Sequence, residues 1–180
     1  MNFSFLLLLI SFLFTIYLLV IVSIFFSPSS IKSIIEGAPP VPSRKEDISF
    51  ALRAVELSRG DVLYDLGSGT GRVVEIAQKE FNAQSVGIER SLFFFIFSKI
   101  IFFFKGVNAK IIRDDFLSIS LSDADILYIY GSKKIMTKLE SRLKRENSLK
   151  IVSYCFSFPN ISPSKKITSP KGNNIFIYKI

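Results

Sequence analysis

The chain begins with an uninterrupted apolar run and only later takes on the mixed pattern of a folded domain. From residue 3 to residue 26 it carries no charged side chain. A helix of about 24 residues, rising about 1.5 Å per residue, can cross the roughly 30 Å hydrocarbon core of a bilayer. A cleaved signal peptide is the alternative, but no basic residue precedes the run, and no small-residue cleavage site comes before Pro28. The pattern predicts a transmembrane anchor at residues 1–27 and a Pro/Ser-rich linker at residues 28–42.

From residue 43 onward, short apolar segments alternate with segments of helical periodicity. Ser43 and Glu46 have the spacing of a capping box and predict a helix start. The apolar residues that follow have the spacing of one helix face: Ile48, Ala51, Leu52 and Val55. Strands are predicted before the glycines at 67–71, at 85–89, at 109–116, in the SDADILYIY segment that ends at Tyr130, at 149–155 and at 174–180, with helices at 73–80, 92–105 and 132–145. The alternation predicts one α/β domain, residues 43–180, with a mostly parallel sheet.

Charge and composition separate the two parts further and exclude several kinds of site. The net charge is +8, and every Lys, Arg, Asp and Glu lies at or beyond Lys32. Basic residues just beyond the apolar run predict a single-pass membrane protein with a cytoplasmic domain, and they favour anionic lipid over nucleic acid as a neighbour. The chain has no His and one cysteine, Cys155, which excludes an intrachain disulfide, a Cys/His zinc site and a Ser-His-Asp triad. No metal is expected.

A glycine-rich turn follows the first strand and leads into a helix. Its sequence, DLGSGTG, spans residues 65–71. Glycines permit positive φ angles and close backbone approach, and the free amides at the start of the next helix favour an anionic or polar ligand group. The candidate ligand-binding residues here are Gly67, Ser68, Gly69 and Gly71. A turn of this kind alone does not separate nicotinamide, flavin and methyl-donor folds.

Acidic residues at two further strand ends sharpen this prediction. Glu89 ends the second strand, where a carboxylate can accept hydrogen bonds from both hydroxyls of a ribose. Asp114 and Asp115 end the third strand, and either could accept from an adenine amino group. Each acid alone could be an ordinary solvated residue at a turn. Together with the glycines, they favour a nucleoside site.

The position of Asp65, two residues before the first glycine, is unusual for nicotinamide-binding folds. At this point the chain resembles the class I S-adenosylmethionine-dependent methyltransferases. The resemblance implies a Rossmann-like α/β fold that ends in an antiparallel strand pair, with S-adenosylmethionine as cofactor. It also implies that Asp65 lies near the methionine part, that Glu89 holds the ribose, and that Asp115, or alternatively Asp114, contacts adenine.

A narrower resemblance covers about residues 36–160. The segments PPVP, DVLYDLGSGTGRVV, VGIER, SDADILYIY and IVSYCFSFPN occur in the order seen in membrane-anchored protein-lysine methyltransferases of the ATP synthase c subunit and adenine nucleotide translocase, and in their microbial relatives. The chain departs from that family at residues 130–132, where Tyr-Gly-Ser replaces a Leu-Pro step, and at 146–148. The resemblance implies a protein substrate, methylated on lysine. Tyr128 and Tyr130, at the end of the fourth strand, are candidate catalytic residues on the acceptor side, with strand packing as the alternative.

Two alternative functions follow from the same residues. One is methylation of a lipid or small molecule that arrives from the bilayer. The other is a membrane-tethered nucleoside-binding protein without turnover, because the departure at residues 130–132 lies where the acceptor is expected.

The predicted helix at 92–105 is apolar nearly all round. A surface helix normally has a polar side, and about 14 residues are too few to span a bilayer. It is therefore either an unusually apolar helix packed on the sheet or a helix whose outer phenylalanines enter the membrane, with Lys99 and Lys105 extending to the lipid head groups.

Overall fold

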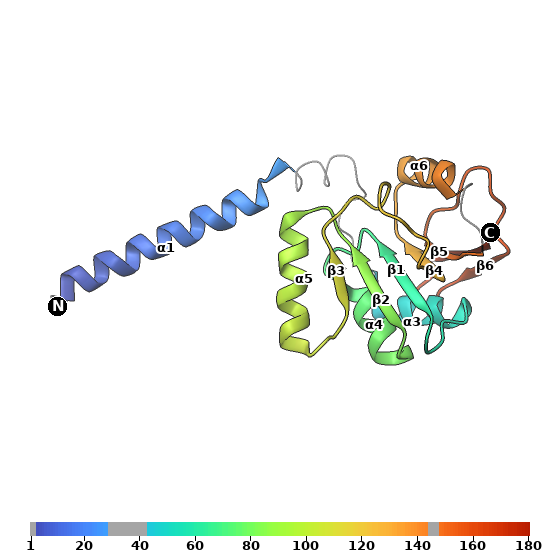
Figure 1. Cartoon of the computed structure of the whole chain (residues 1–180), viewed down its shortest axis with the longest axis horizontal. Coiled ribbons are helices and arrows are strands. Elements are labelled where there is room, and N and C mark those ends of the chain that lie inside the picture. Colours follow the sequence, from blue (N-terminus) through green and yellow to red (C-terminus); the bar gives the residue numbers. More distant parts are fainter. Residues whose placement is uncertain (1–2, 29–42, 144–147) are drawn as a thin grey trace.

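The computed structural model describes residues 3–28, 43–143 and 148–180, and consists of one long helix and a layered α/β domain (Figure 1). The long helix, α1 (Phe3–Phe25), projects from the domain. Its segment Phe3–Ile24 is long and apolar enough to cross a membrane and is not buried against the rest of the chain. A signal sequence would pass the same test of length and composition. Except for Pro28, the predicted linker lies outside the described residues.

A seven-stranded sheet forms the middle layer of the domain, in the order β3-β2-β1-β4-β5-β7-β6. Its first five strands are mutually parallel, whereas β7 is antiparallel to both β5 and β6. The strands are β1 (Val62–Leu66), β2 (Gln84–Ile88), β3 (Lys110–Ile112), β4 (Ile126–Ile129), β5 (Lys150–Tyr154), β6 (Lys165–Thr168) and β7 (Asn174–Lys179). The predicted Rossmann-like sandwich with a C-terminal antiparallel pair is confirmed.

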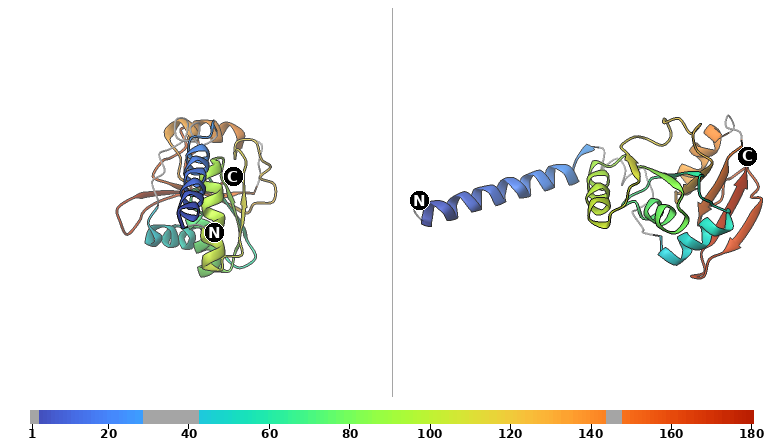
Figure 2. Two further views of the ribbon diagram at one scale, coloured as in Figure 1. Left: turned by 90° about the vertical axis from the view of Figure 1, so that its left-hand side faces the viewer. Right: turned by 60° about the horizontal axis from the view of Figure 1, so that its bottom comes forward.

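Helices cover both faces of this sheet (Figure 2). The helices are α3 (Lys45–Ala54), α4 (Arg72–Phe81), α5 (Leu92–Lys105) and α6 (Lys133–Leu143). The predicted apolar face of α3 is buried and packs with α4 and one face of the sheet. Buried residues of α6 pack on the opposite face with Leu127, Ile129 and Ile151. On the α4 side, Phe102 of α5 packs with Val74 and Ile111 near the β3 edge.

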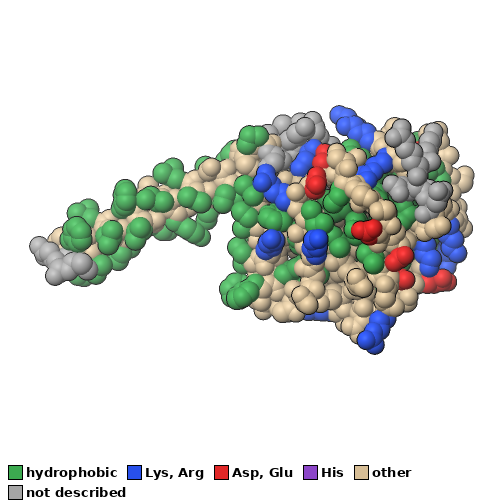
Figure 3. All heavy atoms as spheres, in the orientation of Figure 1, with side chains coloured by type: hydrophobic (Ala, Val, Ile, Leu, Met, Phe, Trp, Pro, Cys, Tyr) green, Lys and Arg blue, Asp and Glu red, His purple; other side chains and the backbone are tan. Residues whose placement is uncertain are grey.

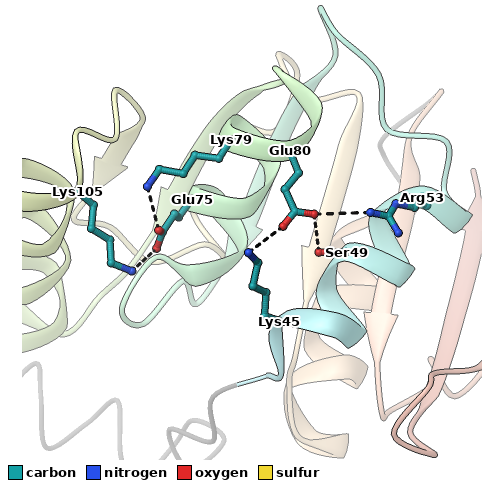
Figure 4. A network of polar contacts seen from close by, with 7 residues as sticks. All are labelled: Lys45, Ser49, Arg53, Glu75, Lys79, Glu80 and Lys105. Carbon is teal, nitrogen blue, oxygen red and sulfur yellow. Dashed lines mark hydrogen bonds and ion pairs between the residues drawn. The ribbon is translucent and has the colours of Figure 1, made fainter.

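Carboxylates on α4 link it to the helices on either side (Figure 4). Glu80 accepts a hydrogen bond from Ser49 Oγ at 2.8 Å and forms an ion pair with Lys45 at 3.2 Å, which joins α4 to α3. Glu75 lies 2.8 Å from Lys105 Nζ, which joins α4 to α5. Partly exposed pairs of this kind contribute about 0–1 kcal/mol each, so the buried apolar faces stabilise the packing more than these contacts do.

Two local predictions differ from the structure. The predicted capping box is wrong: α3 begins at Lys45 with Arg44 as its N-cap and without a side-chain cap. The carbonyl of Ser43 accepts a hydrogen bond from Arg72 Nη1 at 3.0 Å, a tertiary contact that joins the residues before α3 to the start of α4. The third strand is also shorter than predicted and ends at Ile112. The acids after it bond to neighbouring backbone amides and begin a turn.

Candidate functional site

The predicted site residues gather at the carboxyl edge of the parallel strands. Asp65 of β1 lies between Gly87 of β2 and Tyr128 of β4 in the strand register. The glycine-rich loop begins directly after β1, and Glu89 follows β2. In sheets of this type, ligands bind in the crevice outside the carboxyl ends of the strands. The arrangement therefore places the loop and both acids where a ligand is expected.

The glycine-rich loop turns back over the end of β2. The amides of Gly67 and Ser68 both donate to the carbonyl of Ile88, at 2.9 and 3.1 Å. Gly69 has a φ of +54°, a left-handed conformation that favours glycine, and nothing lies within 4 Å of the place that a Cβ would occupy. This leaves the backbone at Gly69 open to close approach by a ligand.

Glu89 connects this loop to the start of α5. It is 5% exposed, and its Oε2 accepts from the Gly69 amide at 2.9 Å while its Oε1 accepts from the Ser91 amide at 2.7 Å. Burial raises the pKa of Glu89, although the two amides oppose that change. The carboxylate is thus held at a fixed place beside the loop, and its remaining acceptor capacity is available to ligand hydroxyls.

Asp65 is the most strongly perturbed acid of the site. It is 4% exposed, and burial, together with the nearby charge of Glu89, raises the pKa of Asp65 to about 8. A buried carboxyl of this kind is stabilised in its ionised form by a nearby cation. The environment of Asp65 therefore suits a positively charged ligand group.

Replacing Asp65 with Asn is expected to stabilise the ligand-free protein at pH 8 and to change little at pH 4. Between the unfolded pKa of about 3.9 and the folded pKa of about 8, the folded protein binds one proton more than the unfolded chain. The free energy of unfolding therefore falls as the pH rises through this window, by up to about 1.4 kcal/mol per pH unit. Urea unfolding of both proteins at several pH values measures the difference. Parallel pH profiles would contradict the raised pKa.

The two acids after β3 are positioned differently. Asp115 Oδ1 accepts from the Leu117 amide at 2.9 Å, and its Oδ2 lies 3.4 Å from Arg90 Nη1. Asp114 is exposed and accepts from the amide of Asp115. Asp115 is thereby linked to the segment that follows Glu89, so of the two it is the better placed to share a ligand with Glu89.

A serine hydroxyl in the loop is buried without a hydrogen-bond partner among the described residues. Ser68 is 8% exposed, and its Oγ has no hydrogen-bond partner among the residues that the structure describes. A Cβ at Gly87 would lie 2.7 Å from this oxygen, so glycine at position 87 gives the hydroxyl its space. An unpaired buried hydroxyl costs free energy that a ligand can recover by bonding to it.

The two candidate tyrosines differ in accessibility. Tyr128 is 1% exposed, and its hydroxyl has no hydrogen bond of normal geometry among the described residues, although Ser43 lies near enough to lower its pKa against the larger effect of burial. Tyr130 follows β4 directly and is half-buried. Its ring lies edge-on to Tyr154, with centroids 5.0 Å apart, and stacks on Phe156 at 6.3 Å. Of the two, Tyr130 is the one that a second substrate could reach.

The residues that support this aromatic cluster were missed by the sequence reasoning. Asp47 is fully buried and accepts from Tyr154 Oη at 2.6 Å and Asn173 Nδ2 at 2.9 Å. Burial alone would raise the pKa of Asp47, but these hydrogen bonds outweigh it, so the pKa is lowered. One signal was present: Asp47 lies four residues before Ala51 and so on the apolar face of α3, where an acid needs a buried partner.

Comparison with known proteins places the chain in a family. The ANTKMT methyltransferase domain family matches residues 65–165, more than half of the chain. A protein-lysine N-methyltransferase of Saccharolobus islandicus is 26% identical over 82% of this chain and 97% of its own length. The Homo sapiens lysine N-methyltransferase that is named for the ATP synthase C subunit is 31% identical over 69% of this chain, which spans about half (54%) of that relative.

Solved structures share the methyltransferase fold. An RNA methyltransferase from Salinibacter ruber, in complex with S-adenosyl-L-homocysteine, superposes with a TM-score of 0.74 at 26% identity, over 78% of this chain and 94% of that one. A methyltransferase from Thiobacillus denitrificans, with the same ligand, has a TM-score of 0.55 at 23% identity, over 63% and 49% of the two chains, and shares the fold. The chain therefore belongs to the ANTKMT methyltransferase family and is a methyltransferase that uses S-adenosylmethionine.

Proposed function

We propose that this enzyme methylates lysine side chains of a protein at or near a membrane, to which α1 anchors it. Relatives named as protein-lysine N-methyltransferases support the acceptor class. The observation that carries the proposal here is the half-buried Tyr130 ring, which lies at the carboxyl end of β4 with Tyr154 and Phe156 around it. The anchor, the single pass and the cytoplasmic side rest on the charge-free α1 and the basic residues beyond it. In this proposal the anchor, linker and catalytic domain are residues 1–27, 28–42 and 43–180.

The residues at the carboxyl edge fit the cofactor by their chemistry. When bound, S-adenosylmethionine supplies an electrophilic methyl group on a sulfonium centre. We assign Asp65 to the positively charged methionine end, Glu89 to the ribose hydroxyls and Asp115, or alternatively Asp114, to adenine. The loop offers the open backbone at Gly69 and the unpaired Ser68 hydroxyl, and Gly67 and Gly71 shape it.

The acceptor side must solve a protonation problem. A lysine amine with a pKa of about 10.4 costs roughly 4–5 kcal/mol to deprotonate at pH 7, and an apolar surrounding lowers that pKa. The rings of Tyr130, Tyr154 and Phe156 provide such a surrounding. An aromatic face also attracts the incoming cation, and the proton then leaves to solvent water, which frees the amine's electron pair for attack on the methyl group. The same three rings hold the amine in line with the methyl group. Such positioning supplies much of the rate enhancement. Tyr128, buried beneath, is proposed to support this wall.

The experiment that tests the function uses the full-length protein in detergent with methyl-labelled S-adenosylmethionine and membranes of the host. We expect label in the protein fraction, on lysine after peptide mapping, and no label with the Glu89→Ala variant. The lipid, small-molecule and RNA fractions are counted separately. Label in one of those fractions, and not in protein, would replace the lysine proposal with another acceptor. Cofactor binding without any labelled product would favour a binding protein.

A further inference from the structure

One side of α5 carries a row of large apolar side chains that face outward. Phe93, Phe97, Ile100 and Phe104 follow one another at helical spacing, and with the adjacent Phe103 they form what we call the outer stripe. Phe97 is 43% exposed, Ile100 49%, Phe103 82% and Phe104 81%. The outward side of a surface helix is normally polar, so the apolar outward side of α5 departs from the usual pattern.

The sheet-facing side of α5 does not need the outer stripe for its packing. Ser98 is fully buried and donates to the Phe95 carbonyl at 2.9 Å. Phe102, at 5% exposure, fills the space beside Gly71 and Ile111. Ser98 and Phe102 thus point inward, while the rings of Phe97, Phe103 and Phe104 point away from the domain. The packing of the domain core therefore does not explain why the outer stripe is apolar.

The outer stripe lies on the flank of the domain from which α1 projects. The two helices are in contact, and both views in Figure 2 place α5 on that flank, with its axis running across the direction of α1 in Figure 1. Figure 3 shows hydrophobic side chains along α1 and on the adjoining edge of the domain, with basic side chains beside them. If α1 follows the bilayer normal, α5 therefore lies along the membrane surface.

We propose that the outer stripe of α5 inserts into the interfacial layer of the bilayer that α1 spans. At 14 residues, α5 is about 21 Å long, too short to cross a bilayer but suited to lie in its surface. Lys99 and Lys105, which flank the stripe, reach toward the head groups with their ammonium ends while their stems stay with the apolar layer. Lys99 lies 4.5 Å from the Phe95 ring, and Lys105 pairs with Glu75 at 2.8 Å, so both are held at the border. The inference rests on the anchor in the proposed function.

The absence of tryptophan from the chain allows a direct test with single-tryptophan variants of the full-length protein. Phe97→Trp and Phe104→Trp report on the outer stripe, and Phe14→Trp reports on α1. Lys166→Trp, exposed on β6 at the far edge of the sheet, is the matched control. Each variant is reconstituted into phosphatidylcholine and phosphatidylglycerol vesicles with or without brominated acyl chains. We expect at least about twofold quenching at positions 97, 104 and 14 and little at position 166, because bromine quenches only tryptophan within the acyl region.

The outcomes separate the inference from the proposed function. Unquenched tryptophan at 97 and 104, beside quenched tryptophan at 14, would overturn the contact of α5 while leaving the anchor intact. Blue-shifted but unquenched emission at 104 would also overturn it, since a second copy or a protein partner would then cover the stripe. Labelled methyl transfer by the same vesicles tests the catalytic proposal independently of either result.

Discussion

Replacing Tyr130 with Ala is expected to reduce methyl transfer by at least about 100-fold while the affinity for S-adenosylmethionine stays within about threefold. The ring lies beyond the end of β4, on the proposed acceptor side, whereas the residues assigned to the cofactor belong to β1 or to the segments that follow β1, β2 and β3. Loss of the ring would leave the amine without an apolar wall and without a fixed direction of approach. Single-turnover rates with methyl-labelled cofactor and binding by calorimetry measure the two quantities.

Two conservative variants sharpen this result. Tyr130→Phe keeps the ring and loses the hydroxyl, so near-normal turnover would assign the role to the ring face, and a loss like that of Ala would assign it to the hydroxyl. Tyr64→Phe, on the opposite face of the sheet, is the control and should behave like the wild type. Unchanged turnover in Tyr130→Ala would remove Tyr130 from the acceptor side.

Replacing Glu89 with Ala is expected to weaken S-adenosylmethionine binding by at least about 100-fold. The variant loses the proposed charge-assisted hydrogen bonds to the ribose, worth about 1.5–3 kcal/mol each. It also releases the amides of Gly69 and Ser91, which Glu89 holds at 2.9 and 2.7 Å. Calorimetric titration with S-adenosylhomocysteine measures the loss, and thermal melts establish that each variant is folded.

Two further variants distinguish a ligand contact of Glu89 from a structural effect of its loss. Glu89→Gln keeps the shape but not the charge and should bind with intermediate affinity. Glu80→Ala removes an acid of the same size whose polar partners in the described part of the chain lie on α3, and it should leave the affinity unchanged. If Glu89→Ala bound the ligand as tightly as Glu80→Ala, the ribose role of Glu89 would be wrong.

The gathering of the candidate cofactor residues at one edge of the sheet could be predicted from the sequence because each of them lies close to a strand end. The glycines, Asp65 and Glu89 all lie at strand ends, and parallel strands bring such ends to one edge. The cluster of Asp47, Tyr154 and Asn173 could not be predicted in this way, since its hydrogen bonds join positions 107 and 126 apart in the chain. The cap at Ser43 was predicted wrongly: α3 begins at Lys45 after Arg44, and the Ser43 side chain lies near Tyr128, a residue far along the chain.

The orientation of α5 marks another limit of sequence patterns. Because the helix is apolar nearly all round, its periodicity cannot say which side faces the sheet. The structure buries Ser98 and exposes Phe103 and Phe104, an orientation that the hydrophobic pattern does not indicate. Packing against Gly71 and Ile111, with room for one ring at Phe102, fixes the orientation.

The fit between Gly71 and Phe102 joins two parts of the molecule that natural selection acts on for different reasons. Gly71 has a φ of +76°, which L side chains rarely adopt, and a Cβ there would lie 2.6 Å from the Phe102 ring, so its backbone and its neighbour both restrict position 71 to glycine. The outward-facing positions of α5 take no part in this contact and are free of that restriction. A lineage can therefore adapt the outer surface of this helix without disturbing the loop behind it.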